Sequence, residues 1–276
     1  LTQYPALLDE LLDADHLYGP LEKHQLRDQL RQQTLHLPCD DQEQHMEEIR
    51  YFCRSCTLRV AAAEIIQTLT LMEVSDQLTW TAEVVVEHVT HIAWQQMASE
   101  YGEPAVQQHS SHNSDTPGFI VVAYGKMGGI EMGYQSDLDL VFLHENAFKQ
   151  TQGGSKSIDS TTFYTRLGRR IIHMLSTSTA SGRAYEIDMR LRPSGNSGML
   201  VSTLSGFAKY QQQDAWTWEH QALVRSRAIT GDPETMARFD QIRTEQLCRS
   251  RDLSRLRKEV TEMRDKMRKH LDKTEN

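Results

Sequence analysis

Two aspartates, Asp137 and Asp139, stand two residues apart in an otherwise apolar run. Because successive side chains of a β-strand point to opposite faces, a strand here would place both carboxylates side by side. Leu138, Leu140 and Phe142 would then point the other way, into a hydrophobic core. Adjacent carboxylates repel each other, and a divalent cation, most simply Mg²⁺ bound to them and to a substrate's phosphates, would relieve that repulsion.

A glycine-punctuated turn precedes the two aspartates. The apolar run 119–124 predicts a short strand, and the residues Gly125-Lys126-Met127-Gly128-Gly129 follow it directly. Glycine allows backbone N–H groups to come close to a phosphate. The turn and the aspartates together indicate a metal-assisted phosphoryl-transfer or nucleotidyl-transfer site.

A second polar segment could contribute to the same chemistry. The alternation over residues 184–193 predicts a strand that ends at a turn at 193–195, with Asp188, Arg190 and Arg192 on one face. Taken alone, these three side chains could form a surface ion-pair ladder. Beside the first strand, the carboxylate could complete a metal site or accept a proton from an attacking hydroxyl, and the arginines could hold phosphate oxygens.

The composition limits the possible classes of protein. The 276 residues suit one large or two modest domains, and no apolar run approaches the length of a membrane helix. A formal net charge of −8 argues against a nucleic-acid groove as the main partner surface. Four cysteines do not make a disulfide scaffold in a chain of this length, so we expect a reducing cytoplasm. The first residues lack a basic region and an initiator Met, which suggests a cut within a longer protein rather than a signal peptide.

The first hundred residues are predicted to be helical. Leu7, Leu8, Leu11 and Leu12 form one apolar face, and a clearer stripe over 43–65 includes Cys53 and Cys56. We interpret these two cysteines as buried core thiols, because no second pair of ligands completes a zinc site. In a further helix over 79–100, His88 and His91 share a face without the intervening Glu of a zincin, which favours helix-surface or partner-facing positions.

The later segments are predicted from the same kinds of pattern. Residues 102–117 form a loop and the best domain boundary, and Asp159 or Ser160 caps the following helix. The two tryptophans Trp216 and Trp218 are expected in the core. A charged helix over 253–271 carries an apolar seam, which would pack back on the first hundred residues or against a continuation of the chain.

Three blocks carry a resemblance to a known family: GKMGGIEMGYQSDLDLVF (125–142), EIDMRLRPSGNSGMLV (186–201) and AWTWEHQALVRSRAITGDP (215–233). In this order and spacing they resemble the glutamine synthetase adenylyltransferase/adenylyl-removing enzymes, of the DNA polymerase β-like nucleotidyltransferase superfamily. The resemblance implies an α+β fold with a mixed, twisted sheet flanked by helices. It also implies a helical segment (1–104), a nucleotidyltransferase core (105–245) and the start of a C-terminal helical region (246–276).

The resemblance also assigns roles to individual residues. It makes Asp137 and Asp139 ligands of Mg²⁺ and Asp188 the third acidic residue of the site. The residues expected near the triphosphate of ATP are Gly125, Lys126, Gly128, Gly129 and Ser136. Arg190 and Arg192 would neutralise phosphate charge, or they would brace Glu186 or Asp188 instead.

Members of this family join two related halves, one that removes AMP from glutamine synthetase by phosphorolysis and one that attaches AMP from ATP to a tyrosine. The third block resembles the adenylylating, C-terminal half. The alternatives are the de-adenylylating half, a small-molecule nucleotidyltransferase, and a docking module with a decayed site, which the three intact carboxylates disfavour. The resemblance implies glutamine synthetase as substrate and PII signalling proteins and glutamine as regulators, with no nucleic acid or membrane as partner.

Overall fold

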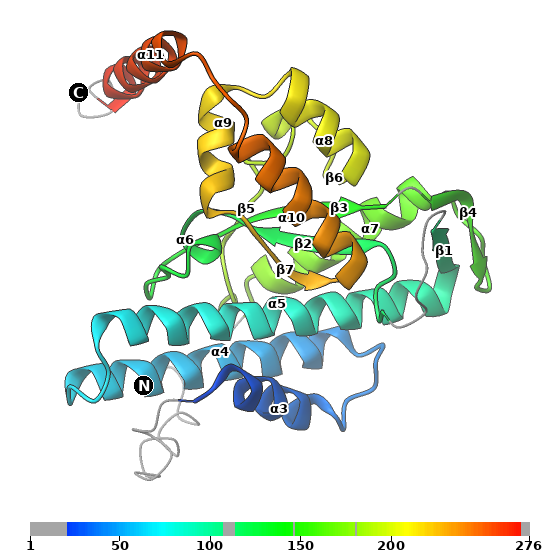
Figure 1. Ribbon diagram of the computed structural model, residues 1–276. Coiled ribbons are helices and arrows are strands. Elements are labelled where there is room, and N and C mark those ends of the chain that lie inside the picture. Colours follow the sequence, from blue (N-terminus) through cyan, green and yellow to red (C-terminus); the bar gives the residue numbers. More distant parts are fainter. Residues whose placement is uncertain (1–20, 107–113, 146, 180, 272–276) are drawn as a thin grey trace.

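The computed structural model describes residues 21–106, 114–145, 147–179 and 181–271. A mixed β-sheet lies between two helical layers (Figure 1), which confirms the predicted α+β class. The predicted apolar face of residues 7–12 lies outside the described residues.

The central sheet has the strand order β5-β3-β2-β7, with β6 also paired to β3. Its strands are β2 (Phe119–Ala123), β3 (Leu138–His144), β5 (Ile187–Asp188), β6 (Val201–Thr203) and β7 (Arg227–Gly231). β2 is antiparallel to both β3 and β7, whereas β5 and β6 run parallel to β3. The sheet is therefore mixed, as predicted.

Three long helices form one outer layer: α3 (Lys23–Thr34), α4 (Gln42–Ile65) and α5 (Leu71–Tyr101). α5 begins earlier than the sequence predicted, because Thr70 and Glu73 form a capping box at its start. α7 (Ser160–Ser176) packs on the same side of the sheet, and the carboxylate of Asp159 caps it by accepting from two backbone N–H groups, as predicted.

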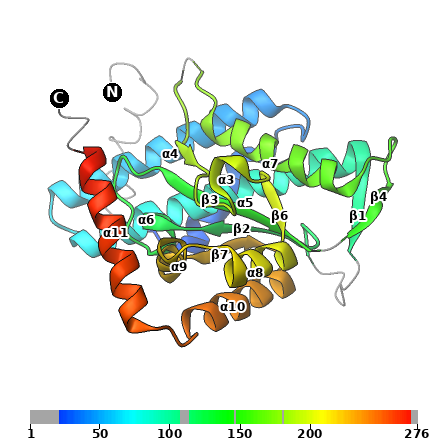
Figure 2. The ribbon, with the colours of Figure 1, turned by 90° about the horizontal axis from the view of Figure 1, so that it is seen from above.

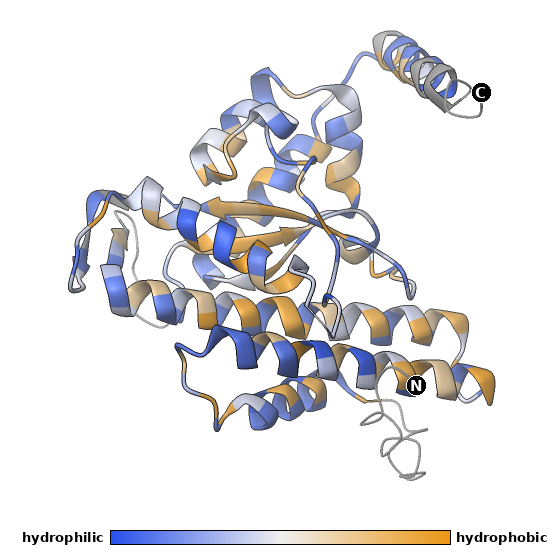
Figure 3. Ribbon diagram, turned by 180° about the vertical axis from the view of Figure 1, so that it is seen from behind, coloured by the Kyte–Doolittle hydropathy of each residue, from blue (hydrophilic) through white to orange (hydrophobic). Residues whose placement is uncertain are grey.

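Further helices cover the other face of the sheet. They are α8 (Leu204–Gln213), α9 (Thr217–Ala222) and α10 (Pro233–Leu247), and a 3₁₀ turn, η2 (Leu223–Arg225), joins α9 to β7. The central strands β2 and β3 are mostly apolar (Figure 3) because both faces of the sheet are covered. In β3, Leu138, Leu140 and Phe142 are fully buried toward α5 and α7, as predicted, whereas Val141 and Leu143 pack toward α8 and α10.

Residues 102–106 are not a loop. Gly102 ends α5 with a φ of +72°, and the chain continues into β1 (Gly102–Val106), which pairs with β4 (Ala147–Gly153). This two-stranded ribbon stands at one end of the molecule in Figure 2. The predicted domain limits at 104 and 245 stay predictions; the Trp94 ring of α5 packs 6.5 Å from the Phe119 ring of β2 across the first of them.

Cys53 and Cys56 are buried thiols that form no disulfide, as predicted. The surface prediction is wrong for His88, whose ring atom Nε2 is buried, because α3 covers that face of α5. The core prediction is wrong for both tryptophans: Trp216 is 63% exposed and Trp218 37% exposed, since both lie on α9 or at its start, at the surface.

The C-terminal helix α11 (Leu253–Leu271) packs against α9, where the hydroxyl of Thr217 donates to the carboxylate of Glu259. It stands apart from the layer of α3, α4 and α5 (Figure 1), so it does not pack back on the first hundred residues. Its seam residues Leu253 and Val260 remain exposed. Among the described helices, none is long and apolar enough to cross a membrane.

Candidate active site

Strand pairing brings the three predicted carboxylates together. Asp137 directly precedes β3, and Asp139 is the second residue of that strand. β5 runs parallel to β3 with Asp188 opposite Asp139. Burial, together with the negative charges of Asp137 and Asp188, raises the pKa of Asp139 to about 6. The three side chains therefore interact electrostatically at one end of the sheet.

Asp188 is held by its own neighbour. The Arg190 guanidinium donates to Asp188 Oδ2 from Nε at 2.7 Å and from Nη2 at 2.5 Å, and the Arg190 backbone N–H donates to Oδ1 at 2.8 Å. These hydrogen bonds keep the pKa of Asp188 below its usual value, although burial opposes them. Of the two roles that the sequence left open for Arg190, the structure shows bracing of Asp188.

The strand predicted over 184–193 is wrong beyond Asp188. The carboxylate of Asp188 accepts the backbone N–H two residues on, which turns the chain away from the sheet, and residues 190–194 form turns. Arg192 donates from Nη1 to the Met189 carbonyl at 2.7 Å, so it also stabilises this turn. Neither arginine braces Glu186, which pairs with Arg183 at 2.6 Å.

The glycine turn forms a single helical turn, α6 (Gly125–Gly128), in contact with β3. Gly125 has a φ of +56°, and a Cβ built there would lie 2.1 Å from Asp139 Oδ2. A Cβ at Gly128 would lie 1.9 Å from the carbonyl oxygen of Arg225. Both glycines are thus required for close packing within the site itself.

The other residues predicted near the triphosphate differ in what they offer. The N–H groups of Gly128 and Gly129 donate to the carbonyls of Tyr124 and Gly125, so these two amides are already used within α6. Lys126 is exposed on the same turn. Ser136 is buried, and its hydroxyl accepts the N–H of Gly133 at 2.9 Å, so it closes the loop that leads to Asp137.

Two arginines of the third block also reach this region, and the sequence had assigned them no role. Arg225 lies in η2. Its positive charge lowers the pKa of Asp139, although burial and the charges of Asp137 and Asp188 raise that pKa more strongly. Arg227 opens β7, and its guanidinium Nη2 donates to the Met127 carbonyl of α6 at 3.2 Å. The only sign in the sequence that these arginines belong to the site was their position in the third block, because the residues they contact lie far from them in the chain.

The donor chemistry at this end of the sheet suits Mg²⁺, which binds carboxylate oxygens. Asp137 and Asp139 offer such oxygens two positions apart. Burial is the main cause of the raised pKa of Asp139, and the charges of Asp137 and Asp188 add to it, so a cation here would relieve their repulsion. Within the described residues, no three His, Cys, Asp or Glu side chains are already arranged to hold a metal. Asp188 is the third carboxylate beside these two aspartates, and both of its oxygens accept hydrogen bonds from Arg190.

A mixed sheet with three carboxylates on neighbouring strands beside a glycine turn is consistent with a nucleotidyltransferase core. The chain belongs to the glutamate-ammonia ligase adenylyltransferase (GlnE) family, whose model matches residues 1–242.

Two relatives are similar over nearly the whole chain. The bifunctional glutamine synthetase adenylyltransferase/adenylyl-removing enzyme of Hahella chejuensis is 53% identical over 263 residues, which is 95% of this chain. The protein of the same description from Pseudomonas putida is 51% identical over 271 residues, or 98% of this chain. In both cases the match covers 27% of the relative's own length.

Proposed function

We propose that this chain is the catalytic part of an adenylyltransferase that transfers AMP from ATP to a tyrosine hydroxyl of glutamine synthetase and releases pyrophosphate. The observation that carries this proposal is the pairing of β3 with β5, which sets Asp188 opposite Asp139 with Asp137 alongside. The names of the relatives, which state both adenylyl transfer to glutamine synthetase and adenylyl removal, support the substrate.

In this proposal Asp137 and Asp139 hold Mg²⁺, which when bound would neutralise phosphate charge and make the α-phosphorus easier to attack. Asp188 is the base that accepts the proton of the tyrosine hydroxyl, whose ordinary pKa is about 10. The oxygen then forms a bond to the α-phosphorus, and the bond to pyrophosphate breaks.

Asp188 needs a change of partner to act as this base, because Arg190 now occupies both of its oxygens. The phosphates of ATP offer Arg190 a second anionic partner, so ATP binding would draw the guanidinium away and free Oδ2 of Asp188, while the backbone N–H keeps Oδ1 in place. The Arg190 side chain is 74% exposed and therefore has room to move. The exposed Lys126 of α6 is a second cation for the phosphates.

The choice of half rests on the third block, whose Trp-Thr-Trp-Glu-His-Gln sequence (216–221) resembles the adenylylating half. The relatives' names contain both activities and favour neither. Regulation by PII proteins and glutamine, and a cytoplasmic location, remain predictions from the resemblance and the composition.

A paired assay tests the proposal. The chain is incubated with glutamine synthetase, Mg²⁺ and ATP labelled at the α-phosphate, and a parallel reaction starts from adenylylated glutamine synthetase and inorganic phosphate. We expect label on glutamine synthetase in the first reaction and no transfer after Mg²⁺ is chelated. Release of ADP in the second reaction alone would assign the chain to the de-adenylylating half.

Single substitutions test the carboxylates. Asp139→Asn and Asp137→Asn remove a metal-binding charge, so we expect a loss of transfer of at least about a hundredfold with the cooperative unfolding transition retained. Asp28→Asn, an exposed carboxylate on α3, is the matched control and should keep full activity. Activity that survives Asp139→Asn would exclude this residue as a metal ligand.

A further inference from the structure

A hollow lies at the opposite end of the sheet from the three carboxylates. Its volume is about 660 Å³, within the range of small-molecule sites. It is bounded by α3, by the segment that joins α3 to α4, by α5 and by the end of β7 at Thr230 and Gly231. β7 begins at Arg227, beside α6, so the length of this strand separates the hollow from the candidate active site.

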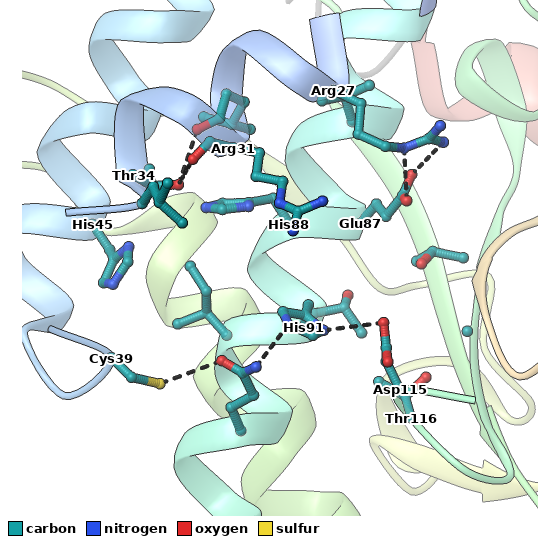
Figure 4. Close-up of a pocket in the computed structure, with 18 of the residues that line it drawn as sticks. Arg27, Arg31, Thr34, Cys39, His45, Glu87, His88, His91, Asp115 and Thr116 are labelled. Atoms are coloured by element: carbon teal, nitrogen blue, oxygen red, sulfur yellow. Dashed lines mark hydrogen bonds and ion pairs between the residues drawn. The ribbon is translucent and has the colours of Figure 1, made fainter. Parts of the chain in front are cut away.

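Three imidazoles point into the hollow, His45 from α4 and His88 and His91 from α5 (Figure 4). The ring atom Nε2 of His45 lies 3.1 Å from the Pro38 carbonyl oxygen, which can only accept, so Nε2 carries the hydrogen. A neutral His45 therefore presents Nδ1 as a hydrogen-bond acceptor. Nδ1 is buried and has no partner in the described part of the chain.

Two further polar atoms of the lining are in the same situation. His88 Nε2 and the Thr90 hydroxyl are buried without a partner among residues that the structure describes. An unpaired buried polar atom costs about 1–3 kcal/mol, so three such atoms in the lining of one hollow, with the rings of His45 and His88 only 6.3 Å apart, indicate a site built to receive hydrogen bonds. Burial lowers the pKa of His45, and of His88 to about 4, so both rings are neutral at pH 7 and offer hydrogen bonds rather than charge.

The charged groups of the lining leave one cation over. Arg27 donates to Glu87 from Nε and Nη2, both at 2.9 Å, and His91 Nδ1 lies 3.6 Å from Asp115 Oδ2. Arg31, on α3, also lines the hollow (Figure 4), and in the described residues no carboxylate lies within ion-pair distance of it. A free guanidinium at such a place is suited to an acidic group.

We propose that this hollow is a binding site for a small organic acid that carries a hydroxyl. The acid group pairs with Arg31, and the hydroxyl donates to His45 Nδ1. The apolar side chains of Leu30, Val84 and Ile92 contact the carbon skeleton. The competing interpretation is a hollow filled by solvent alone, since water would also satisfy the three polar atoms.

Two pairs of probes test the proposal without any assay of AMP transfer. Malate and citrate carry the hydroxyl, and succinate and tricarballylate are the same acids without it. Binding to the whole chain is measured by calorimetry and by thermal unfolding at constant ionic strength, without Mg²⁺. We expect saturable binding of malate or citrate below about 10 mM, and at least about tenfold weaker binding of the acid that lacks the hydroxyl.

Variants separate this site from other anion-binding surfaces. Arg31→Gln changes an exposed side chain, so it should leave folding unchanged. It should weaken the binding of the hydroxy acid at least about tenfold. Arg264→Gln, exposed on α11, is the matched control and should have no effect. His45→Phe keeps a ring and removes the acceptor Nδ1, so it should reduce the preference for the hydroxy acid.

Two results would overturn the proposal. Absence of saturable binding by all four acids would leave solvent as the only occupant of the hollow. Binding that is unchanged by Arg31→Gln would place the acids on another surface. If His45→Phe failed to fold, the comparison of each acid with its hydroxyl-free partner in the unaltered chain would still decide the role of the hydroxyl.

Discussion

Gly125 shows how closely the turn and the acidic strand fit together. Its φ of +56° and the 2.1 Å that would separate a Cβ from Asp139 Oδ2 exclude any other residue without a shift of Asp139. We therefore expect Gly125→Ala to lower AMP transfer by at least about a hundredfold. A displacement of the Asp139 carboxylate by about 1 Å would have an effect of this size in the proposed mechanism. Transfer of label to glutamine synthetase measures it.

Gly153 provides the control for Gly125. It also has a positive φ, +88°, but no heavy atom lies within 4 Å of the position of its Cβ. Gly153→Ala should therefore cost about 1–3 kcal/mol of unfolding free energy through backbone strain, with activity retained. Equal loss of activity in both variants would attribute the effect at Gly125 to the backbone alone.

The carboxylates of the candidate site were predictable from the sequence, whereas their immediate partners were not. The spacing of Asp137 and Asp139 places them on one face of any strand, whatever the fold around it. The hold of Arg190 on Asp188 depends on where β5 ends, and the alternation of the sequence continues past that point. The hydrogen bond from the Arg190 backbone N–H to Asp188 ends the strand, and no pattern of residue types predicts that bond.

Among the elements, α5 is linked to the candidate site through a buried carboxylate. The Glu83 side chain is 3% exposed and pairs with Lys23 of α3 and with Arg227 of β7. Arg227 in turn donates to the Met127 carbonyl of α6. Glu83 therefore connects the helical layer, the edge strand of the sheet and the glycine turn.

Glu83→Gln is expected to destabilise the fold by about 3 kcal/mol, because it leaves two partly enclosed cations without their anion. It should also lower AMP transfer, since Arg227 loses its hold beside α6. Urea unfolding and the labelled-ATP assay measure the two effects.

Glu87, one turn later on α5, is the matched control for Glu83. It forms a bidentate pair with Arg27, but its side chain is 33% exposed. An exposed pair contributes less than about 1 kcal/mol, so Glu87→Gln should change stability only slightly. If both variants lost the same stability, burial of the ion pair would not be the cause.

Elements with strong local signals were predictable, and those that depend on distant partners were not. The cap of α7 is local, and Asp159 was one of the two residues predicted for it. β1 was assigned to a loop because its residues become a strand only through pairing with β4, some forty-five residues further on. The two tryptophans were placed in the core by residue type, although α9 lies at the surface.

At the scale of the whole molecule, the sheet is buried between two separate apolar clusters, and its two ends carry different polar sites. The strand order could not be derived from spacing, because parallel pairing of β3 with β5 and β6 depends on the crossover through α7. The hollow beside α3 and α5 could not be predicted either, since its residues come from four separate segments of the chain. Only the resemblance indicated a mixed sheet in advance.

The stability of the whole molecule should fall between pH 7 and pH 5, partly through His144. This histidine is 6% exposed at the end of β3, its ring is stacked 4.0 Å from that of Tyr164, and burial lowers its pKa to about 4. The unfolded chain takes up a proton near pH 6.5, where the folded chain does not, so stability is full above that pH and decreases as the pH falls toward 4. Each pKa unit is worth about 1.4 kcal/mol.

His144→Phe isolates this contribution, because it keeps a ring against Tyr164 and removes the imidazole that takes up the proton. Asp139 changes stability in the opposite direction over the same range, since its pKa is raised to about 6, and it does so equally in both proteins. The difference in unfolding free energy between wild type and variant, measured in urea at pH 7 and pH 5, should therefore shift by about 2 kcal/mol against the wild type at pH 5. A difference that stays constant with pH would show that His144 takes up its proton within the fold, and that the end of β3 opens readily to water.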